Sequence, residues 1–229
     1  MDKMVRQQAR RQNPQALRRR LRLVGRASRR SLSRLFAAFT CLILAALGGP
    51  ASAHPNITMT CRVLFNFAGN SVDGIGEVWT FDAGFSAELL KDFDANKDGL
   101  LSDAEAAAMG KDVMKNLGDS RDFTYVFVDG HDLGAIKTEG FRARAENGIV
   151  SIAFGVPLKT PVDPRIHKLS VEIKDEEFFV FATFATDRPV LMRGEGAAAD
   201  ACMPKLVDDP AGAYFGGAII PSAATLVCG

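Results

Sequence analysis

The chain has 229 residues, and its formal net charge of +1 at pH 7 is the sum of two unlike parts. Residues 1–53 carry 12 Lys or Arg and one acid, Asp2, whereas residues 54–229 carry 16 Lys or Arg and 26 acids. The acidic second part excludes nucleic-acid binding by charge alone. Its 176 residues are enough for a single domain with its own core.

The first part has the pattern of a signal peptide. An Arg-rich segment precedes an apolar run at residues 35–47, and the Ala-Ser-Ala at residues 51–53 is a small-x-small cleavage site. We expect cleavage to leave His54 as the first residue of a periplasmic or secreted protein. A membrane span needs about 20 apolar residues, so we expect no stable anchor, and an uncleaved anchor is the alternative. Residues 28–34 partly match a twin-arginine signal, and that route and the general secretory route both stay open.

Two strands are predicted to begin the mature chain. Apolar residues alternate over residues 57–67 and again over residues 76–81, the second of which carries the only Trp, Trp79. Residues 69–73 are predicted to form the turn between them. Both strands should contribute one apolar face to a core.

The apolar spacing then changes to that of helices. It predicts one helix over residues 85–93 and another over residues 104–117, which ends at Gly118. An Asp-rich loop separates the two helices. We therefore expect a helix-loop-helix insert at about residues 84–118, after the second strand.

Residues 94–105, between these helices, match the calcium-binding loop of an EF-hand. Side-chain oxygens recur at loop positions one, three, five, nine and twelve, and Gly99 at position six permits the turn. The predicted calcium ligands are Asp94, Asn96, Asp98, Leu100 (through its carbonyl), Ser102 and Glu105. A degenerate loop that keeps the turn but has lost useful affinity is the alternative. Because no second such loop is found, a rigid, constantly occupied site is favoured over a switch that opens.

Strand patterns resume after the insert. The predicted strands are residues 123–128, 141–145, 149–156, 169–173 and 178–183. Turn residues at Asp129-Gly130 and at residues 146–148 predict hairpins. The sequence from Gly194 onward is rich in Ala and Gly and predicts an irregular tail. The predicted fold class is α+β: a mostly antiparallel, sandwich-like β domain with the helix-loop-helix inserted, spanning residues 54–229.

Three cysteines lie in the mature part: Cys61, Cys202 and Cys228. We expect a disulfide between Cys202 and Cys228, which would tether the tail, in keeping with an oxidising compartment. Cys61 is then a buried thiol in a strand. A bridge from Cys61 to either of the others is the alternative.

Several motifs together resemble a family of bacterial periplasmic proteins of unknown function, often labelled periplasmic components of an uncharacterised ABC-type transport system. They are His54-Pro55, residues 79–82, Phe85-Ser86, residues 90–93, Phe123-Thr124, residues 128–130, Cys202 and Cys228. The resemblance covers most of residues 54–205 and implies export, a β-rich fold and a link to metal-ion transport. Members usually begin His-Pro-His, whereas Asn56 stands third here.

His54 is a further candidate metal ligand. A terminal amine and an imidazole on one residue chelate copper, nickel or zinc, and His131, His167 and Cys61 are the donors that the sequence offers beside it. Solvated loop positions are the simpler interpretation of His131 and His167. No catalytic motif is present, and residues 175–177, three acids in a row, are interpreted as a charged turn, so we expect a protein that is not an enzyme.

The sequence therefore leads to three hypotheses. The first is an exported calcium-binding protein, an accessory or binding component of a periplasmic metal-transport system, with a membrane metal transporter as partner. The second is a secreted enzyme or a copper, nickel or zinc protein that uses His54. The third is a structural or interaction module with calcium as its only ligand. The oligomeric state is left open.

Overall fold

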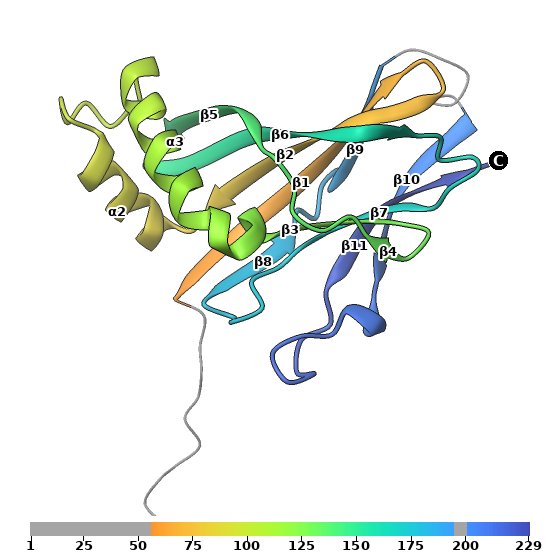
Figure 1. Ribbon diagram of the computed structural model, residues 1–229. Helices are drawn as coiled ribbons and strands as arrows, with labels where there is room; N and C mark the ends of the chain where they lie inside the picture. Colours follow the sequence, from red (N-terminus) through yellow and green to blue (C-terminus); the bar gives the residue numbers. More distant parts are fainter. Residues whose placement is uncertain (1–55, 195–200) are drawn as a thin grey trace, which may run out of the picture. The chain divides into compact units, whose positions relative to one another are not determined.

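A computed structural model describes residues 56–194 and 201–229, which form two β-sheets with a pair of helices at one end (Figure 1). The first sheet has six strands: β1 (Ile57–Ala68), β2 (Ser71–Phe81), β5 (Glu139–Glu146), β6 (Ile149–Val162), β8 (Val180–Phe184) and β9 (Val190–Arg193). Their order is β5-β6-β2-β1-β8, and β9 also pairs with β1. The long strands β1, β2 and β6 thus form the centre of this sheet.

The second sheet has five strands: β3 (Thr124–Val128), β4 (His131–Asp132), β7 (Leu169–Ile173), β10 (Cys202–Asp208) and β11 (Ser222–Cys228). Their order is β10-β11-β7-β3-β4, and all the pairs are antiparallel. The chain passes from this sheet to the first between β4 and β5 and again between β7 and β8. The α+β class and the mostly antiparallel, sandwich-like layout predicted from the sequence are confirmed.

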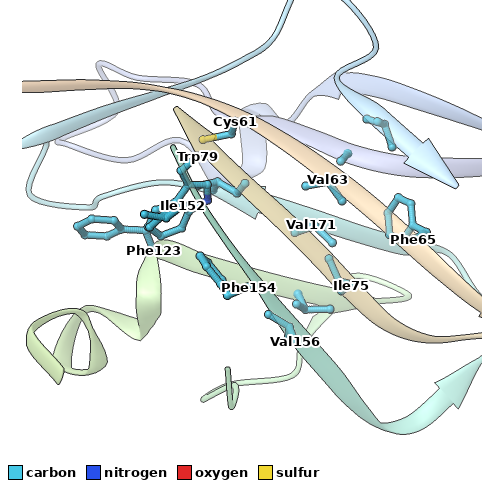
Figure 2. Packing of buried hydrophobic residues seen from close by; sticks show 14 of the residues in the cluster. Cys61, Val63, Phe65, Ile75, Trp79, Phe123, Ile152, Phe154, Val156 and Val171 are labelled. Atoms are coloured by element: carbon cyan, nitrogen blue, oxygen red, sulfur yellow. The ribbon is translucent and has the colours of Figure 1, made fainter. Parts of the chain in front are cut away.

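The core lies on the faces that alternation in the sequence predicts. In β1, Cys61, Val63 and Phe65 are each 0% exposed, and the residues between them are only half-buried. Figure 2 shows these side chains with Trp79 of β2 and with others from both sheets. A strand turns successive side chains to opposite faces, so one apolar residue in two is enough to build this core.

The helical insert consists of α2 (Ala83–Phe93), α3 (Asp103–Leu117) and the 3-10 helix η1 (Gly118–Phe123). As predicted, it follows the second strand, and the first sheet covers its apolar side. The Val150 N–H of β6 donates to Ser86 Oγ of α2 at 3.0 Å, and Gly110 of α3 lies against the ring of Phe141 in β5. Gly118 is the C-cap residue of α3, although the chain continues directly into η1.

Replacing Gly110 with Ala tests this helix-to-sheet contact. A Cβ atom there would lie 2.5 Å from Cδ1 of Phe141, so the ring or the helix has to shift. We expect Gly110→Ala to lower the free energy of unfolding by about 1–3 kcal/mol, measured by denaturant unfolding. Helix propensity alone would raise it by about 1 kcal/mol, so a stabilised variant would contradict the packing. Adding Phe141→Leu should relieve part of the loss.

The prediction of an irregular tail from Gly194 onward is wrong for residues 201–229, and residues 195–200 lie outside the described residues. Residues 202–208 and 222–228 form β10 and β11, with the 3-10 helix η2 (Pro210–Gly212) between them. β11 is an interior strand, and Ala224 on it is 0% exposed. Small alanines suit a crowded sheet interior, and Pro204 is tolerated because β10 lies at the sheet edge.

Three smaller differences concern the first sheet. β2 begins at Ser71, so the turn is shorter than residues 69–73, and β6 extends to Val162. β9 was not predicted. Both β8 and β9 pair with β1 in parallel, in succession along its length: Ile57 lies opposite Val180 and Val63 opposite Val190. These parallel pairings depend on long crossovers, which leave no local pattern in the sequence.

Candidate functional site

The helix α2, which leads into the loop between α2 and α3, is held at its start by a side-chain cap. Asp82, the N-cap residue of α2, accepts the Phe85 N–H at 2.9 Å and the Thr58 N–H of β1 at 2.7 Å. At the other end of α2, the Asp94 N–H donates to the Leu90 carbonyl at 2.9 Å. The position of the loop relative to the sheet is therefore fixed through α2.

Asp94 organises the first half of the loop. Its Oδ1 accepts the Asp98 N–H at 3.2 Å, and its Oδ2 accepts the Gly99 N–H at 2.8 Å. Asn96 Oδ1 also accepts the Asp98 N–H, and Asp98 Oδ1 accepts the Leu100 N–H at 2.8 Å. Gly99 has φ of 79°, a left-handed conformation that favours glycine at this loop position.

Glu105 closes the loop from the first turn of α3. Its Oε1 accepts the Ala95 N–H at 2.8 Å, across ten residues of chain. Its Oε2 accepts the N–H and the hydroxyl of Ser102, at 2.9 and 2.7 Å, and the Glu105 N–H returns a bond to Ser102 Oγ. The Ser102 hydroxyl and these backbone N–H groups lower the pKa of Glu105, which keeps the carboxylate charged.

Every predicted calcium ligand lies in this one loop or in the turn that closes it. The side chain of Leu100 is 56% exposed, as expected of a residue that would ligate through its carbonyl, and Leu101 packs against the core. Within residues 56–194 and 201–229, no group of three or more His, Cys, Asp or Glu side chains is arranged as a metal site. The loop carboxylates point to backbone N–H groups of the loop itself.

The donor chemistry nevertheless fits a hard cation. A carboxylate oxygen has two lone pairs, so an oxygen that accepts a single N–H bond, such as Asp94 Oδ2 or Glu105 Oε1, keeps the other free. Asp94, Asp98 and Glu105 bring three carboxylates to one short loop, with Lys97 as its only basic residue. A divalent cation would offset the repulsion between these charges, and oxygen ligands of this kind suit calcium.

Among the described residues, the other candidate metal ligands form no metal site. His54 lies outside the described residues. His131 and His167 are exposed, and His167 Nδ1 lies 2.7 Å from Asp129 Oδ2. Cys61 is buried in β1, where loss of water and then the nearby Glu77 raise the pKa of its thiol, so it remains a protonated core residue.

The predicted disulfide between Cys202 and Cys228 is present. The two residues face each other across β10 and β11, with Cα atoms 4.0 Å apart. A bond of this kind is typical of oxidising compartments and is compatible with export.

Residues 175–177 form the predicted turn between β7 and β8, and Asp175 Oδ2 accepts the N–H groups of Phe179 and Val180, each at 2.9 Å. In the described ranges, no helix is long and apolar enough to span a membrane.

A buried carboxyl cluster at Glu77 was missed by the sequence reasoning. Glu77 is 1% exposed, and its carboxylate accepts the Trp79 Nε1–H at 2.9 Å and the Thr124 hydroxyl at 3.0 Å. Burial raises the pKa of Glu77 to about 7, and the same cause raises the pKa of nearby Asp122. The alternation in β2 could have identified it, because Glu77 lies on the same buried face of the strand as Ile75 and Trp79.

Together, the fold and the site define a class of protein: a two-sheet α+β domain, stapled by a disulfide, that carries an acidic helix-loop-helix insert. The family model described as "Protein of unknown function (DUF1007)" matches residues 39–212, and the chain belongs to this family. A relative in Spirochaeta aurantia, described as an uncharacterized 15.5 kDa protein in trpE 3' region, is 27% identical over 138 residues. The match covers 58% of this chain and 94% of that protein.

Proposed function

We propose that the protein is an exported calcium-binding protein that acts as an accessory or binding component of a periplasmic metal-transport system. One observation carries the calcium part. Six oxygen-donor positions at EF-hand spacing occupy a loop whose two ends are joined by the bond from the Ala95 N–H to Glu105 Oε1. Export is supported by the disulfide and by the signal-peptide pattern of residues 1–53.

Calcium suits this loop better than magnesium. Calcium accepts six to eight oxygen ligands at flexible distances, whereas magnesium demands near-octahedral geometry and keeps several of its waters. The loop offers a carbonyl, an amide, a hydroxyl and three carboxylates, a mixed set of unequal reach. Outside the cell, a dissociation constant of about 10⁻⁴–10⁻³ M is enough to keep such a site filled.

The proposed role of calcium is structural. An EF-hand that acts as a switch exposes an apolar groove by separating its helices. Here α2 is held to β6 by the bond from the Val150 N–H to Ser86, and α3 is packed on Phe141 through Gly110. Opening the pair would break these contacts. We therefore propose that calcium holds the helices on the sheet at all times.

The link to metal transport rests on the family resemblance of the motifs between His54 and Cys228. A role in metal transport is independent of calcium binding and needs a separate test. In the host, cells lacking this chain should differ from the parent in their content of one transition metal, measured by elemental analysis. Equal metal content under metal limitation and metal excess would remove this part of the proposal.

Calorimetric titration tests the calcium part. After treatment with a chelator, the purified protein should bind one calcium ion per chain with millimolar affinity or tighter, and magnesium should bind more weakly. Calcium should also raise the melting temperature, because a ligand that binds only the folded state stabilises it. Absence of both heat and a thermal shift would mean that the loop keeps its turn without binding calcium.

A further inference from the structure

A second candidate site lies far from the loop, at the edge of the sandwich where β3 and β4 face β6. A cavity of about 670 Å³ opens there. This volume lies in the range of about 300–1,000 Å³ that is typical of small-molecule sites. On this side, the second sheet has the β3–β4 hairpin as its edge, and the first sheet has the β5–β6 hairpin. The segment from Leu133 to Thr138 crosses from β4 of the second sheet to β5 of the first.

The interior of the cavity is aliphatic. Val126 and Val128 line it from β3, and Val156, Leu158 and Val162 line it from β6. Val126 and Val156 are 0% and 1% exposed, so they belong to the rigid core rather than to a loop. Among the described residues, no Phe, Tyr or Trp lines the cavity, which suits an alkyl chain rather than a stacked ring.

The rim of the cavity is polar and carries more basic than acidic groups. Lys137 and Lys159 lie there with His131, His167 and a single acid, Asp129. The Asp129 carboxylate already has partners, because it contacts His167 Nδ1 at 2.7 Å and accepts the Lys168 N–H at 2.8 Å. The His167 contact lowers the pKa of Asp129, so this acid is charged and already has bonding partners within the protein.

The two lysines at the rim have no such match. Neither Lys137 nor Lys159 forms an ion pair within the part of the chain that the structure describes. Their ammonium groups therefore remain available to a ligand. A guest with an aliphatic body would lie among the valines and present a negative charge to these two residues.

We propose that this cavity binds a single-chain aliphatic carboxylate, of the chemical class of medium-chain fatty acids. The site is independent of calcium. β6 meets α2 near Val150, whereas its Val156–Val162 segment lines the cavity, so about 20–40 Å of extended strand separates the two. Loss of calcium binding in the loop would leave this inference unaffected.

Titration of the purified full chain with dodecanoate tests the proposal. We expect one bound molecule per chain, weaker binding of uncharged dodecanol, and the weakest binding of dodecyltrimethylammonium, whose charge is of the wrong sign. Equal binding of all three probes would overturn the role of the lysines. Capture by anionic or neutral lipid vesicles with no binding of monomeric dodecanoate would indicate a membrane surface instead and overturn the proposal.

Two variants locate the binding. Ala135→Trp places a large side chain at the mouth of the cavity and should abolish dodecanoate binding, while Ala213→Trp, at an exposed position elsewhere, should not. The double variant Lys137→Gln and Lys159→Gln should weaken dodecanoate at least about fivefold and leave dodecanol unchanged. Lys205→Gln, on the exposed face of β10, is its control.

The apolar residues 35–47 are the same in every variant, so differences between variants report the cavity alone. Binding that survives Ala135→Trp with the fold intact would overturn the assignment. Circular dichroism and the melting temperature establish that the fold is intact. Chemical-shift changes on titration should fall on Val126–Val128 and Val156–Thr160, and changes confined to other strands would also overturn it.

Discussion

Glu105→Gln is expected to weaken calcium binding at least about tenfold and to shrink the rise in melting temperature that calcium produces. In EF-hands generally, the glutamate at the last loop position supplies two of the oxygens that surround calcium, and an amide would supply only one, without charge. In this structure the same carboxylate also accepts the Ala95 N–H and two bonds from Ser102. The measurement is a pair of melting curves, with calcium and with chelator, for parent and variant.

Asp103→Asn is the matched control. Asp103 is exposed and lies two residues before Glu105. Its substitution removes the same single negative charge, but Asp103 is not among the proposed ligands. We expect it to keep nearly the full calcium-dependent shift. If calcium raises the melting temperature of Glu105→Gln as much as that of the parent, the proposed structural role of calcium is contradicted. If both variants lose the shift equally, net charge rather than ligation explains the binding.

Glu77 is expected to make the protein less stable as pH rises from about 4.5 to about 7, by about 3 kcal/mol in the free energy of unfolding. Burial holds the folded-state pKa of Glu77 at about 7, against 4.5 when unfolded. Between these values the folded state binds a proton that the unfolded state has released. The stabilisation is therefore complete below pH 4.5 and lost as pH passes 7.

Glu77→Gln should remove this slope. The amide imitates the protonated acid: its oxygen accepts the Trp79 Nε1–H, and its NH₂ group donates to Thr124 Oγ1. The Thr124 hydroxyl then donates to the Asp122 carbonyl, to which it is already bonded at 2.9 Å. We expect parent and variant to be similar near pH 4.5, and the variant to be the more stable at pH 8.

Chemical unfolding at several pH values measures the difference. Subtracting the two profiles cancels the exposed acids with lowered pKa, such as Asp129, whose contributions change below pH 4. Glu176→Gln, an exposed acid in the β7–β8 turn, should keep the parental profile. A variant at Glu77 with the same slope as the parent would show that another group titrates in this range.

Local patterns predicted the elements whose environment is uniform along their length. β1 alternates between the core and the opposite face from Met59 to Phe67, so a period of two in the sequence is enough to identify it. α2 and α3 bury one face on the sheet, and their spacing shows it. The loop was also predictable, because its twelve positions act within one short stretch of chain.

Features that depend on distant parts of the chain were not predictable. β11 is buried through Ala223, Ala224 and Thr225 in succession, without the alternation that marks a strand, and only its place between β10 and β7 makes it a strand. The parallel pairing of β8 with β1 joins residues such as Ile57 and Val180. The cavity depends on how β3 and β6 face each other across the two sheets. None of these leaves a periodic signal.

The position of β1 has a consequence for when the protein can fold. β1 comes first among the described strands, yet its full set of neighbours includes β8 and β9, which follow more than a hundred residues later. The second sheet likewise lacks one of its interior strands, β11, until Ser222–Cys228 has emerged. A nascent chain therefore holds a half-built core until its last strand is made. Contacts this distant in sequence slow folding to milliseconds or longer, and strand edges stay unpaired during that time.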